Sequence, residues 1–180
     1  MRIISGKHRS RIIKMVGLDS TRETTDKVRG AVFNLILDYP LKGIGLDLFS
    51  GSGAMGLEAM SRGLDFCYFN DINKKASETT KENIKALGYV EQSKIYNLDY
   101  KNCLKLLDKK LDFVFLDPPY NLDVNFEITN YLFEHDLLND NCLIIMEVKK
   151  ELDYQINDYF EVYKERVYGI RKIVILRKKL

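Results

Sequence analysis

Residues 47–56 have the sequence DLFSGSGAMG and continue the strand that we expect over residues 44–49. The apolar character of that run is typical of a buried strand. Gly51 and Gly53 permit positive φ and close approach of a ligand to the backbone, and Gly56 permits tight packing of a helix on a strand. The segment therefore predicts a strand, a glycine-rich loop and a helix, which is the first unit of an open α/β sheet.

Strands and helices alternate on both sides of this junction. The expected strands are residues 44–49, 66–70, 94–98, 111–116, 142–147, 159–167 and 171–177, and the expected helices are residues 25–38, 54–62, 74–87, 100–107 and a stretch within 124–135. Such alternation predicts a Rossmann-like, seven-stranded and mostly parallel sheet with helices on both faces. The last two strands, joined at Tyr168-Gly169, should form an antiparallel hairpin at one edge.

A second motif, Asp117-Pro118-Pro119-Tyr120, follows the expected strand 111–116. Proline has no backbone N–H and a fixed φ, so the strand must end here, and Pro118 keeps Asp117 extended. Ligands bind at the carboxyl ends of the strands in an open parallel sheet. We therefore expect a carboxylate, a carbonyl oxygen and an aromatic ring at the ligand-binding edge. Taken alone, the motif would also fit a tight turn with Asp117 as a cap.

The charge is unevenly distributed along the 180 residues. The formal net charge is +2, but residues 1–14 contain five lysines and arginines and no acid. A basic arm on a near-neutral body indicates a polyanionic partner. A hairpin at a sheet edge, with basic side chains that deter aggregation, explains the same charges equally well. The β-prone pieces at residues 2–4 and 11–13 favour a small hairpin or an extended arm.

The composition is 46% hydrophobic and 30% charged, with no membrane-length apolar run and no signal-peptide pattern, so we expect a cytoplasmic protein without a membrane partner. Cys67, Cys103 and Cys142 are predicted to be reduced core residues, and two scattered histidines argue against a metal site. We expect a single domain with a basic arm over residues 1–23 and a main body over residues 24–180 that begins with the docking helix 25–38.

The glycine loop is compatible with two kinds of cofactor. Asp71 follows Gly51 by twenty residues, which matches the dinucleotide fingerprint and allows an NAD-dependent oxidoreductase. Asp47 favours S-adenosylmethionine, because a carboxylate before the loop would repel a pyrophosphate but suits a ligand with an ammonium group. In either case Asp71 would accept hydrogen bonds from ribose hydroxyls. Asp99 would accept from the adenine amine or would cap the next helix.

Together these motifs resemble the class I S-adenosylmethionine-dependent methyltransferases, and more narrowly the RsmD family, which methylates N2 of a guanine in bacterial 16S rRNA (the guanine 966 type). The resemblance covers nearly the whole chain and rests on segments 1–6, 24–29, 33–34, 47–53, 56–59, 61–63 and 117–120. It implies that the cofactor is S-adenosylmethionine. The partner would be 16S rRNA within a small-subunit assembly intermediate, bound by a monomer.

The motifs, the basic arm and the resemblance together predict roles for individual residues. The cofactor would be bound by Asp47, Phe49, Gly51, Gly53, Asp71 and Asp99, the catalytic residues would be Asp117, Pro118 and Tyr120, and the RNA would be contacted by Arg2, Lys7, Arg9, Arg11, Arg22 and Arg29. The Asp117 carboxylate and the Pro118 carbonyl would each accept one N–H of the amine, so that its lone pair points at the methyl group. Tyr120 would stack on the flipped base.

Other functions fit parts of this pattern. Adenine N6 is also an exocyclic amine, so an adenine-N6 methyltransferase acting on RNA or DNA remains the nearest alternative. Sequence-specific DNA enzymes usually need a further recognition domain, for which 180 residues leave little room. The NAD-dependent oxidoreductase is a more distant alternative, because Asp117 to Tyr120 has no role in hydride transfer.

Overall fold

The computed structural model describes residues 1–17, 26–119, 124–151 and 153–179. The helices within these ranges are α1 (Asp26–Leu35), α2 (Ala54–Ser61), α3 (Lys74–Leu87), the short 3-10 helix η1 (Val90–Gln92), α4 (Tyr100–Lys105) and α5 (Asn125–Glu134). The strands are β1 (Ile44–Asp47), β2 (Phe66–Asn70), β3 (Ser93–Tyr96), β4 (Leu111–Leu116), β5 (Leu138–Lys149), β6 (Phe160–Tyr168) and β7 (Arg171–Lys178).

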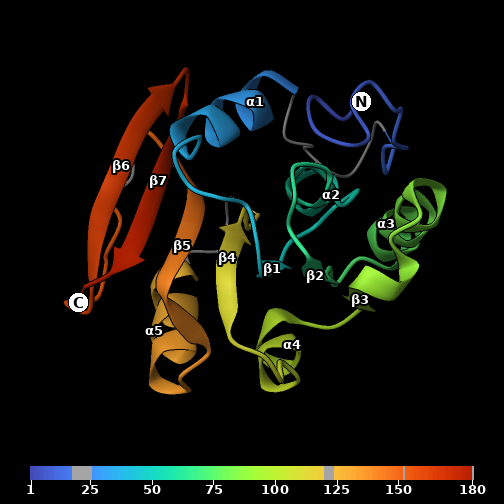
Figure 1. Ribbon diagram of the computed structural model, residues 1–180. Helices are drawn as coiled ribbons and strands as arrows, with labels where there is room; N and C mark the ends of the chain where they lie inside the picture. Colours follow the sequence, from blue (N-terminus) through green and yellow to red (C-terminus); the bar gives the residue numbers. More distant parts are fainter. Residues whose placement is uncertain (18–25, 120–123, 152, 180) are drawn as a thin grey trace.

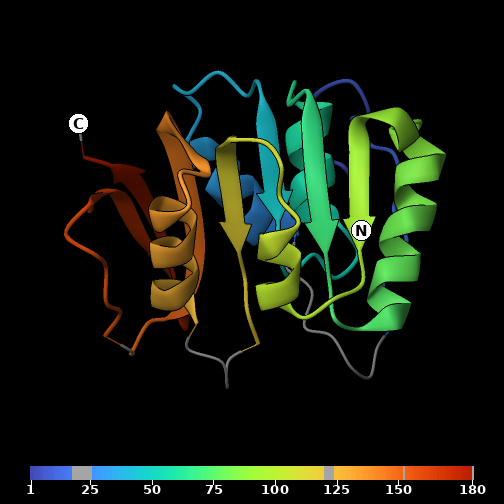
Figure 2. The same ribbon diagram turned by 90° about the horizontal axis from the view of Figure 1, so that it is seen from below.

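The strands form one seven-stranded sheet in the order β3-β2-β1-β4-β5-β7-β6. Strands β1 to β5 are parallel to their neighbours within that set, and β7 lies antiparallel between β5 and β6. Figures 1 and 2 show this sheet between two groups of helices. The predicted Rossmann-like α/β fold is therefore confirmed, including the antiparallel hairpin at one edge.

Each face of the sheet has its own apolar core. Side chains of α1, α2 and α3 pack with Phe113, Phe115 and Ile145 on one face. Side chains of α4 and α5 pack with Leu116, Val114 and other residues on the opposite face. Since the side chains of a strand alternate between its two faces, both cores are built from the same strands. This three-layer arrangement holds the carboxyl ends of the parallel strands at one edge.

Local capping signals set the helix boundaries. The Asn73 side chain accepts from the backbone N–H of Ala76 at 3.1 Å and begins α3, and Gly88, with φ of 76°, ends it. The α1 helix ends at Leu35, earlier than the expected 38, because Tyr39 N–H turns back to the Ile36 carbonyl at 2.9 Å. Strand β5 begins at Leu138, well before the expected residue 142. A register shift lets Leu138 pair with Leu111 of β4, although the polar residues 139–141 follow it.

Gly56 places α2 close against β2. A Cβ added at this position would lie 2.4 Å from Cε1 of Phe69 and 3.0 Å from Sγ of Cys67. No larger residue fits unless the helix moves away from the sheet. The predicted reason for this glycine, tight packing of helix on strand, is thus seen in the contacts.

The N-terminal segment, residues 1–17, lies over α2 and α3 (Figure 1). It forms a single antiparallel bridge between Arg2 and Ile12, in agreement with the expected small hairpin. The described part of this segment adds no strand to the sheet, which disfavours the sheet-edge hairpin. Instead it is bound to α2: the backbone N–H groups of Ile4 and Ser5 donate to the Glu58 carboxylate at 2.8 and 3.0 Å.

Arg29 has a structural role that differs from the predicted RNA contact. Its side chain is completely buried beneath the N-terminal segment. It forms ion pairs with Glu58 at 3.3 Å and with Asp26 at 3.0 Å, and Nη2 donates to the Arg2 carbonyl. The prediction was wrong because an arginine on a helix is expected to be exposed to solvent. The sequence does not show that the Glu58 carboxylate lies close enough to pair with it.

The three cysteines are buried free thiols, as predicted. Within the described ranges, no helix is both long and apolar enough to cross a membrane. The same ranges contain no group of three or more histidine, cysteine or acidic side chains that could bind a metal ion.

Candidate active site

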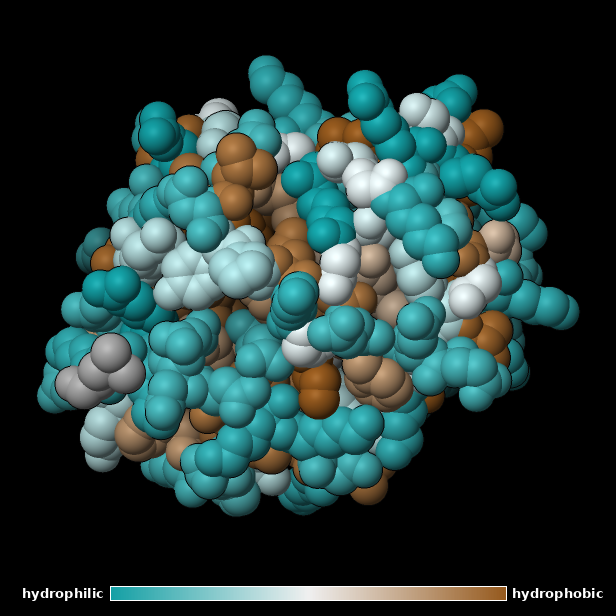
Figure 3. All heavy atoms as spheres, viewed as in Figure 1, coloured by the Kyte–Doolittle hydropathy of each residue, from teal (hydrophilic) through white to brown (hydrophobic). Residues whose placement is uncertain are grey.

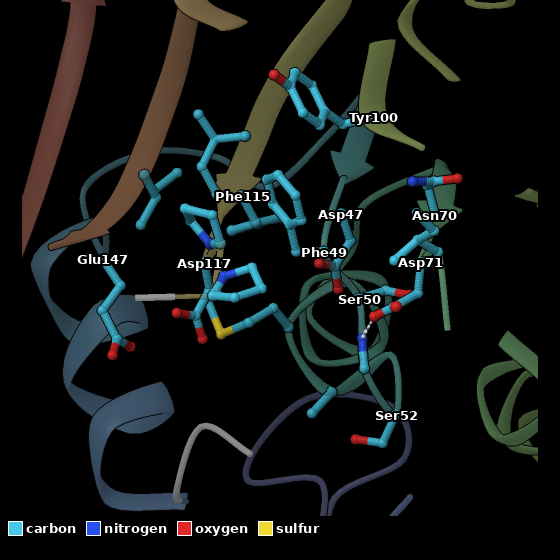
Figure 4. Close-up of a pocket in the computed structure, with 18 of the residues that line it drawn as sticks. Asp47, Phe49, Ser50, Ser52, Asn70, Asp71, Tyr100, Phe115, Asp117 and Glu147 are labelled. Carbon is cyan, nitrogen blue, oxygen red and sulfur yellow. Dashed lines mark hydrogen bonds between the residues drawn. The ribbon is translucent and has the colours of Figure 1, made fainter. Parts of the chain in front are cut away.

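A cavity of about 610 Å³ lies at the carboxyl edge of the parallel strands. It extends from the end of β3 across β2, β1, β4 and β5 to β7 (Figure 4). Five carboxylates line its described part, and these belong to Asp47, Asp71, Asp99, Asp117 and Glu147. The apolar part of the cavity wall includes the side chains of Phe49, Met55, Ile72 and Leu98. A cavity with such a lining can hold a nucleoside-sized ligand that carries positive charge.

The glycine loop after β1 is fixed by hydrogen bonds on both sides. The N–H of Gly51 donates to Asp71 at 2.9 Å, drawn as a dashed line in Figure 4, and its carbonyl accepts from Thr80 Oγ1 at 2.9 Å. The Ser52 carbonyl accepts from Asn83 Nδ2 at 2.9 Å. Gly51 has φ of 53°, and nothing lies within 4 Å of an added Cβ. The loop therefore presents bare backbone to the cavity.

Gly53 does not line the cavity. It has φ of 81° and occupies the N-cap position of α2. Its N–H donates to the Ser50 carbonyl at 2.6 Å, and its own carbonyl accepts from Leu57 N–H at 2.9 Å. The structure thus places this predicted cofactor residue in the turn that shapes the loop, while the other five predicted cofactor residues line the cavity.

Asp47 ends β1 beneath the loop and is 3% exposed. Its Oδ2 accepts from the N–H of Gly56 at 2.9 Å, which ties the first turn of α2 to the strand. Burial is the main reason why the pKa of Asp47 is raised to about 7. The hydrogen bond from Gly56 opposes this rise, and the charges of Asp117 and Asp71 add to it. A positive ligand beside Asp47 would favour its ionised form.

Asp71 and Asp99 lie at the ends of β2 and β3. The Asp71 carboxylate accepts from Gly51 N–H on one oxygen and from Asn73 N–H, at 2.9 Å, on the other. Asp99 caps α4 by accepting from Asn102 N–H at 3.1 Å. The capping interpretation of Asp99 is therefore confirmed, and the same side chain also lines the cavity. Each carboxylate oxygen has a second lone pair for a ligand.

The opposite half of the cavity contains Asp117 and Pro118, as predicted, together with a buried ion pair. Glu147, at the end of β5, and Arg171, at the start of β7, are joined by Arg171 Nη1, at 2.8 Å from one carboxylate oxygen and 3.0 Å from the other. Figure 4 shows the Asp117 and Glu147 side chains entering the same part of the site. Tyr120, the third predicted catalytic residue, lies outside the described residues.

Four of the predicted RNA-contacting residues, Arg2, Lys7, Arg9 and Arg11, are exposed on the N-terminal segment. Arg22 lies outside the described residues, and Arg29 is buried. Figure 3 shows the face that carries this segment and α1, where hydrophilic residues dominate and apolar ones appear in small groups. The segment borders the cavity loop, because Asn83 Nδ2 contacts both the Lys14 carbonyl and the Ser52 carbonyl at 2.9 Å.

Sequence reasoning missed several residues of this site. Asn70 ties three strand ends together, since its Nδ2 contacts the carbonyls of Leu48 at 3.2 Å and Leu98 at 3.0 Å. Glu147 and Arg171 were also missed. Glu147 is the last residue of an expected strand, and Asp47 and Asp117 likewise lie near the carboxyl ends of theirs, so the signal that identified those two acids was present for it as well. Nothing local to Arg171 indicates that it reaches the cavity.

Comparison with known proteins is consistent with this geometry. The family described as "Conserved hypothetical protein 95" matches residues 1–177. The Bacillus subtilis protein YlbH is 36% identical over 184 residues, which cover 99% of this chain and 100% of that protein. Ribosomal RNA small subunit methyltransferase D of Haemophilus influenzae is 31% identical over 94% of this chain and 90% of that protein. The solved structure of Escherichia coli yhhF superimposes with a TM-score of 0.87 at 26% identity, covering 99% of this chain and 98% of that one.

The strand order, the glycine loop after β1 and the acids at the strand ends define a class I methyltransferase with a Rossmann-like fold. This excludes the NAD-dependent oxidoreductase that the glycine motif alone allowed. Within the class, the chain belongs to the RsmD family of methyltransferases.

Proposed function

We propose that this protein transfers a methyl group from S-adenosylmethionine to N2 of a guanine in 16S rRNA, of the guanine 966 type. The observation that carries the proposal is the presence of Asp117 and Pro118 in the same cavity as the glycine loop. One half of the cavity suits the cofactor and the other half suits an amine. Relatives named as small-subunit rRNA methyltransferases support the choice of RNA.

The residues of the cofactor half fit S-adenosylmethionine, which supplies an electrophilic methyl group on a positively charged sulfur. The open backbone at Gly51 lets the amino-acid end of the ligand approach the loop. Asp71 would accept from the ribose hydroxyls, and Asp99 would accept from the adenine amine. The acidic lining favours a cation and disfavours a pyrophosphate, since the cationic side chain found among the described lining residues, Arg171, is paired with Glu147.

In the acceptor half, Asp117 and Pro118 prepare the amine for attack. The lone pair of the guanine amine is delocalised into the ring, so the nitrogen is a poor nucleophile. If the Asp117 carboxylate and the Pro118 carbonyl each accept one N–H, the lone pair is directed toward the methyl carbon at roughly 3 to 3.5 Å. The nitrogen becomes acidic as it gains the methyl group, and Asp117 can then accept or pass on its proton. Tyr120 is proposed to stack on the base.

Arg2, Lys7, Arg9 and Arg11 are proposed to bind RNA phosphates beside the cavity. They are exposed on one segment that hydrogen bonds hold against α2 and α3. Phosphate contacts of this kind fix the position of an RNA but do not select the base. We propose that the enzyme acts as a monomer on a small-subunit assembly intermediate.

The proposal is tested by deleting the gene and mapping the methyl groups of 16S rRNA. We expect one guanine to lose its N2-methyl group, and a plasmid copy should restore it. The Asp117→Ala copy should not restore it, although the purified variant should still gain thermal stability from S-adenosylhomocysteine. The matched control is Asp158→Ala, an exposed aspartate outside the cavity, which should restore methylation. Unchanged guanine methylation in the deletion strain would refute the assignment.

A further inference from the structure

We propose that Glu147, held in place by Arg171, selects guanine over adenine by accepting the N1–H of the target base. This inference rests on the proposed function and deepens it, because Asp117 and Pro118 would bind the amine of either purine. The supporting observation is a buried ion pair on the wall of the acceptor half, 8% exposed at Glu147 and 7% exposed at Arg171.

The register of the sheet places Glu147 next to Asp117. Leu116 and Met146 are Cα partners on the parallel strands β4 and β5, so the residues that follow them are neighbours, roughly 5 Å apart. Leu116 and Met146 point to the α4 and α5 face. Because side chains alternate along a strand, Asp117 and Glu147 are both directed toward the α1 face, and both line the cavity. The two carboxylates therefore meet the same edge of a bound base.

The third member, Arg171, comes from the next strand. In the sheet order β4, β5, β7 the charged side chains among the described residues of the acceptor half are the Asp117 carboxylate, the Glu147 carboxylate and the Arg171 guanidinium. Their hydrogen-bonding characters are acceptor, acceptor and donor. Guanine presents the complementary edge of amine N–H, N1–H and O6, which is donor, donor and acceptor. A flipped base is read through this edge.

Adenine does not match this array. Next to its amine it has the N1 lone pair, which would face the Glu147 carboxylate. Two acceptors in contact without a proton between them repel each other, and a buried acceptor that loses its partner is costly. Discrimination therefore arises at the atom next to the reacting amine, where Asp117 cannot contribute.

Arg171 has two roles in this scheme, because it positions Glu147 and supplies the donor of the array. Its Nη1 lies within 3.0 Å of both oxygens of Glu147, which fixes the carboxylate against the wall and supplies the counter-charge that a buried carboxylate requires. In the proposed arrangement the remaining donors of the guanidinium would bind O6.

The test compares guanine with 2-aminopurine, a base that keeps the N2 amine but has a lone pair at N1 and no O6. Each base is placed at the nucleotide identified by the deletion experiment, in a ligated synthetic RNA that is used both naked and in a reconstituted small-subunit particle. For each enzyme the ratio of kcat/KM for guanine to that for 2-aminopurine is measured. This ratio is independent of the folded fraction of the preparation.

We expect the wild-type ratio to fall roughly ten- to hundredfold in Glu147→Gln, because a neutral amide oxygen accepts N1–H more weakly than the carboxylate does, whereas the amide NH2 can donate to the N1 lone pair of 2-aminopurine. The double variant Glu147→Gln with Arg171→Gln leaves no unpaired buried charge, and it should also lose selectivity. The control is Glu161→Gln, whose partner Arg177 forms an ion pair on the same sheet outside the cavity. It should keep the wild-type ratio.

The outcomes separate the two proposals. If the wild-type enzyme methylates N6 of an adenine, or if it methylates neither of the two RNAs, the proposed function is overturned and the inference with it. A wild-type enzyme that methylates guanine N2, with the same ratio in both Glu147 variants, overturns only the inference. A fall in the ratio, with binding of S-adenosylhomocysteine retained, supports both.

Discussion

The substitution Glu58→Gln removes a buried negative charge that joins α2 to α1 and to the N-terminal segment. The Glu58 carboxylate accepts from the N–H groups of Ile4 and Ser5 and from Arg62 Nε at 2.8 Å, and it pairs with Arg29. Glutamine keeps the size of the side chain and one acceptor oxygen. It leaves Arg29 completely buried, with the half-exposed Asp26 as its remaining ion-pair partner among the described residues.

The magnitude follows from the burial of this cluster. Breaking a buried ion pair by removing one partner costs about 3–5 kcal/mol, because the other charge stays desolvated. For a domain of this size each kcal/mol lowers Tm by about 2–4 °C, so we expect a decrease of roughly 6–20 °C. A loss of about 3–5 kcal/mol is a large share of the roughly 5–15 kcal/mol by which domains are usually stable.

Urea unfolding followed by circular dichroism measures the free energy of unfolding. The control is Glu82→Gln, which breaks an ion pair to Lys14 of the same N-terminal segment, with side chains 56% and 70% exposed. It should cost less than about 1 kcal/mol. Adding Arg29→Met to Glu58→Gln should recover part of the lost stability, because the unpaired charge is removed. Equal effects of the two single substitutions would refute the reasoning.

Two further predictions concern charge in other parts of the molecule. The folded pKa of Asp47, about 7, lies above its unfolded value, so its contribution to stability is present at low pH and is lost as pH rises toward 7. Asp47→Asn should therefore gain stability over the wild type between about pH 4 and 7, by up to a few kcal/mol, and urea unfolding curves that differ equally at every pH would contradict this. Arg9→Ala should weaken RNA binding and reduce its salt slope by about one, as measured by titrations at several salt concentrations. Lys109→Ala, at the amino edge of the sheet, is its control, and equal slopes would exclude a phosphate contact at Arg9.

Signals that act over a few residues made much of the fold predictable. Asn73 and Gly88 mark the ends of α3 in any context, because a cap acts on the backbone of the same turn. Two consecutive prolines end β4 for an equally local reason. Because the carboxyl ends of parallel strands share one edge of a sheet, placing Asp47, Asp71, Asp99 and Asp117 at one site followed from strand order alone.

The sequence by itself thus determined the alternating elements, the glycine loop and the acids at the strand ends. Only the tertiary structure decided which charged residues meet. The sequence predicts that Arg29 is an exposed helix residue, but it is buried against Glu58. The sequence predicts only that Glu147 ends a strand, and the structure shows that it is paired with Arg171 beside Asp117. The physical reason is that an ion pair depends on distance in space, and the register between β4, β5 and β7 is fixed by packing across the whole sheet.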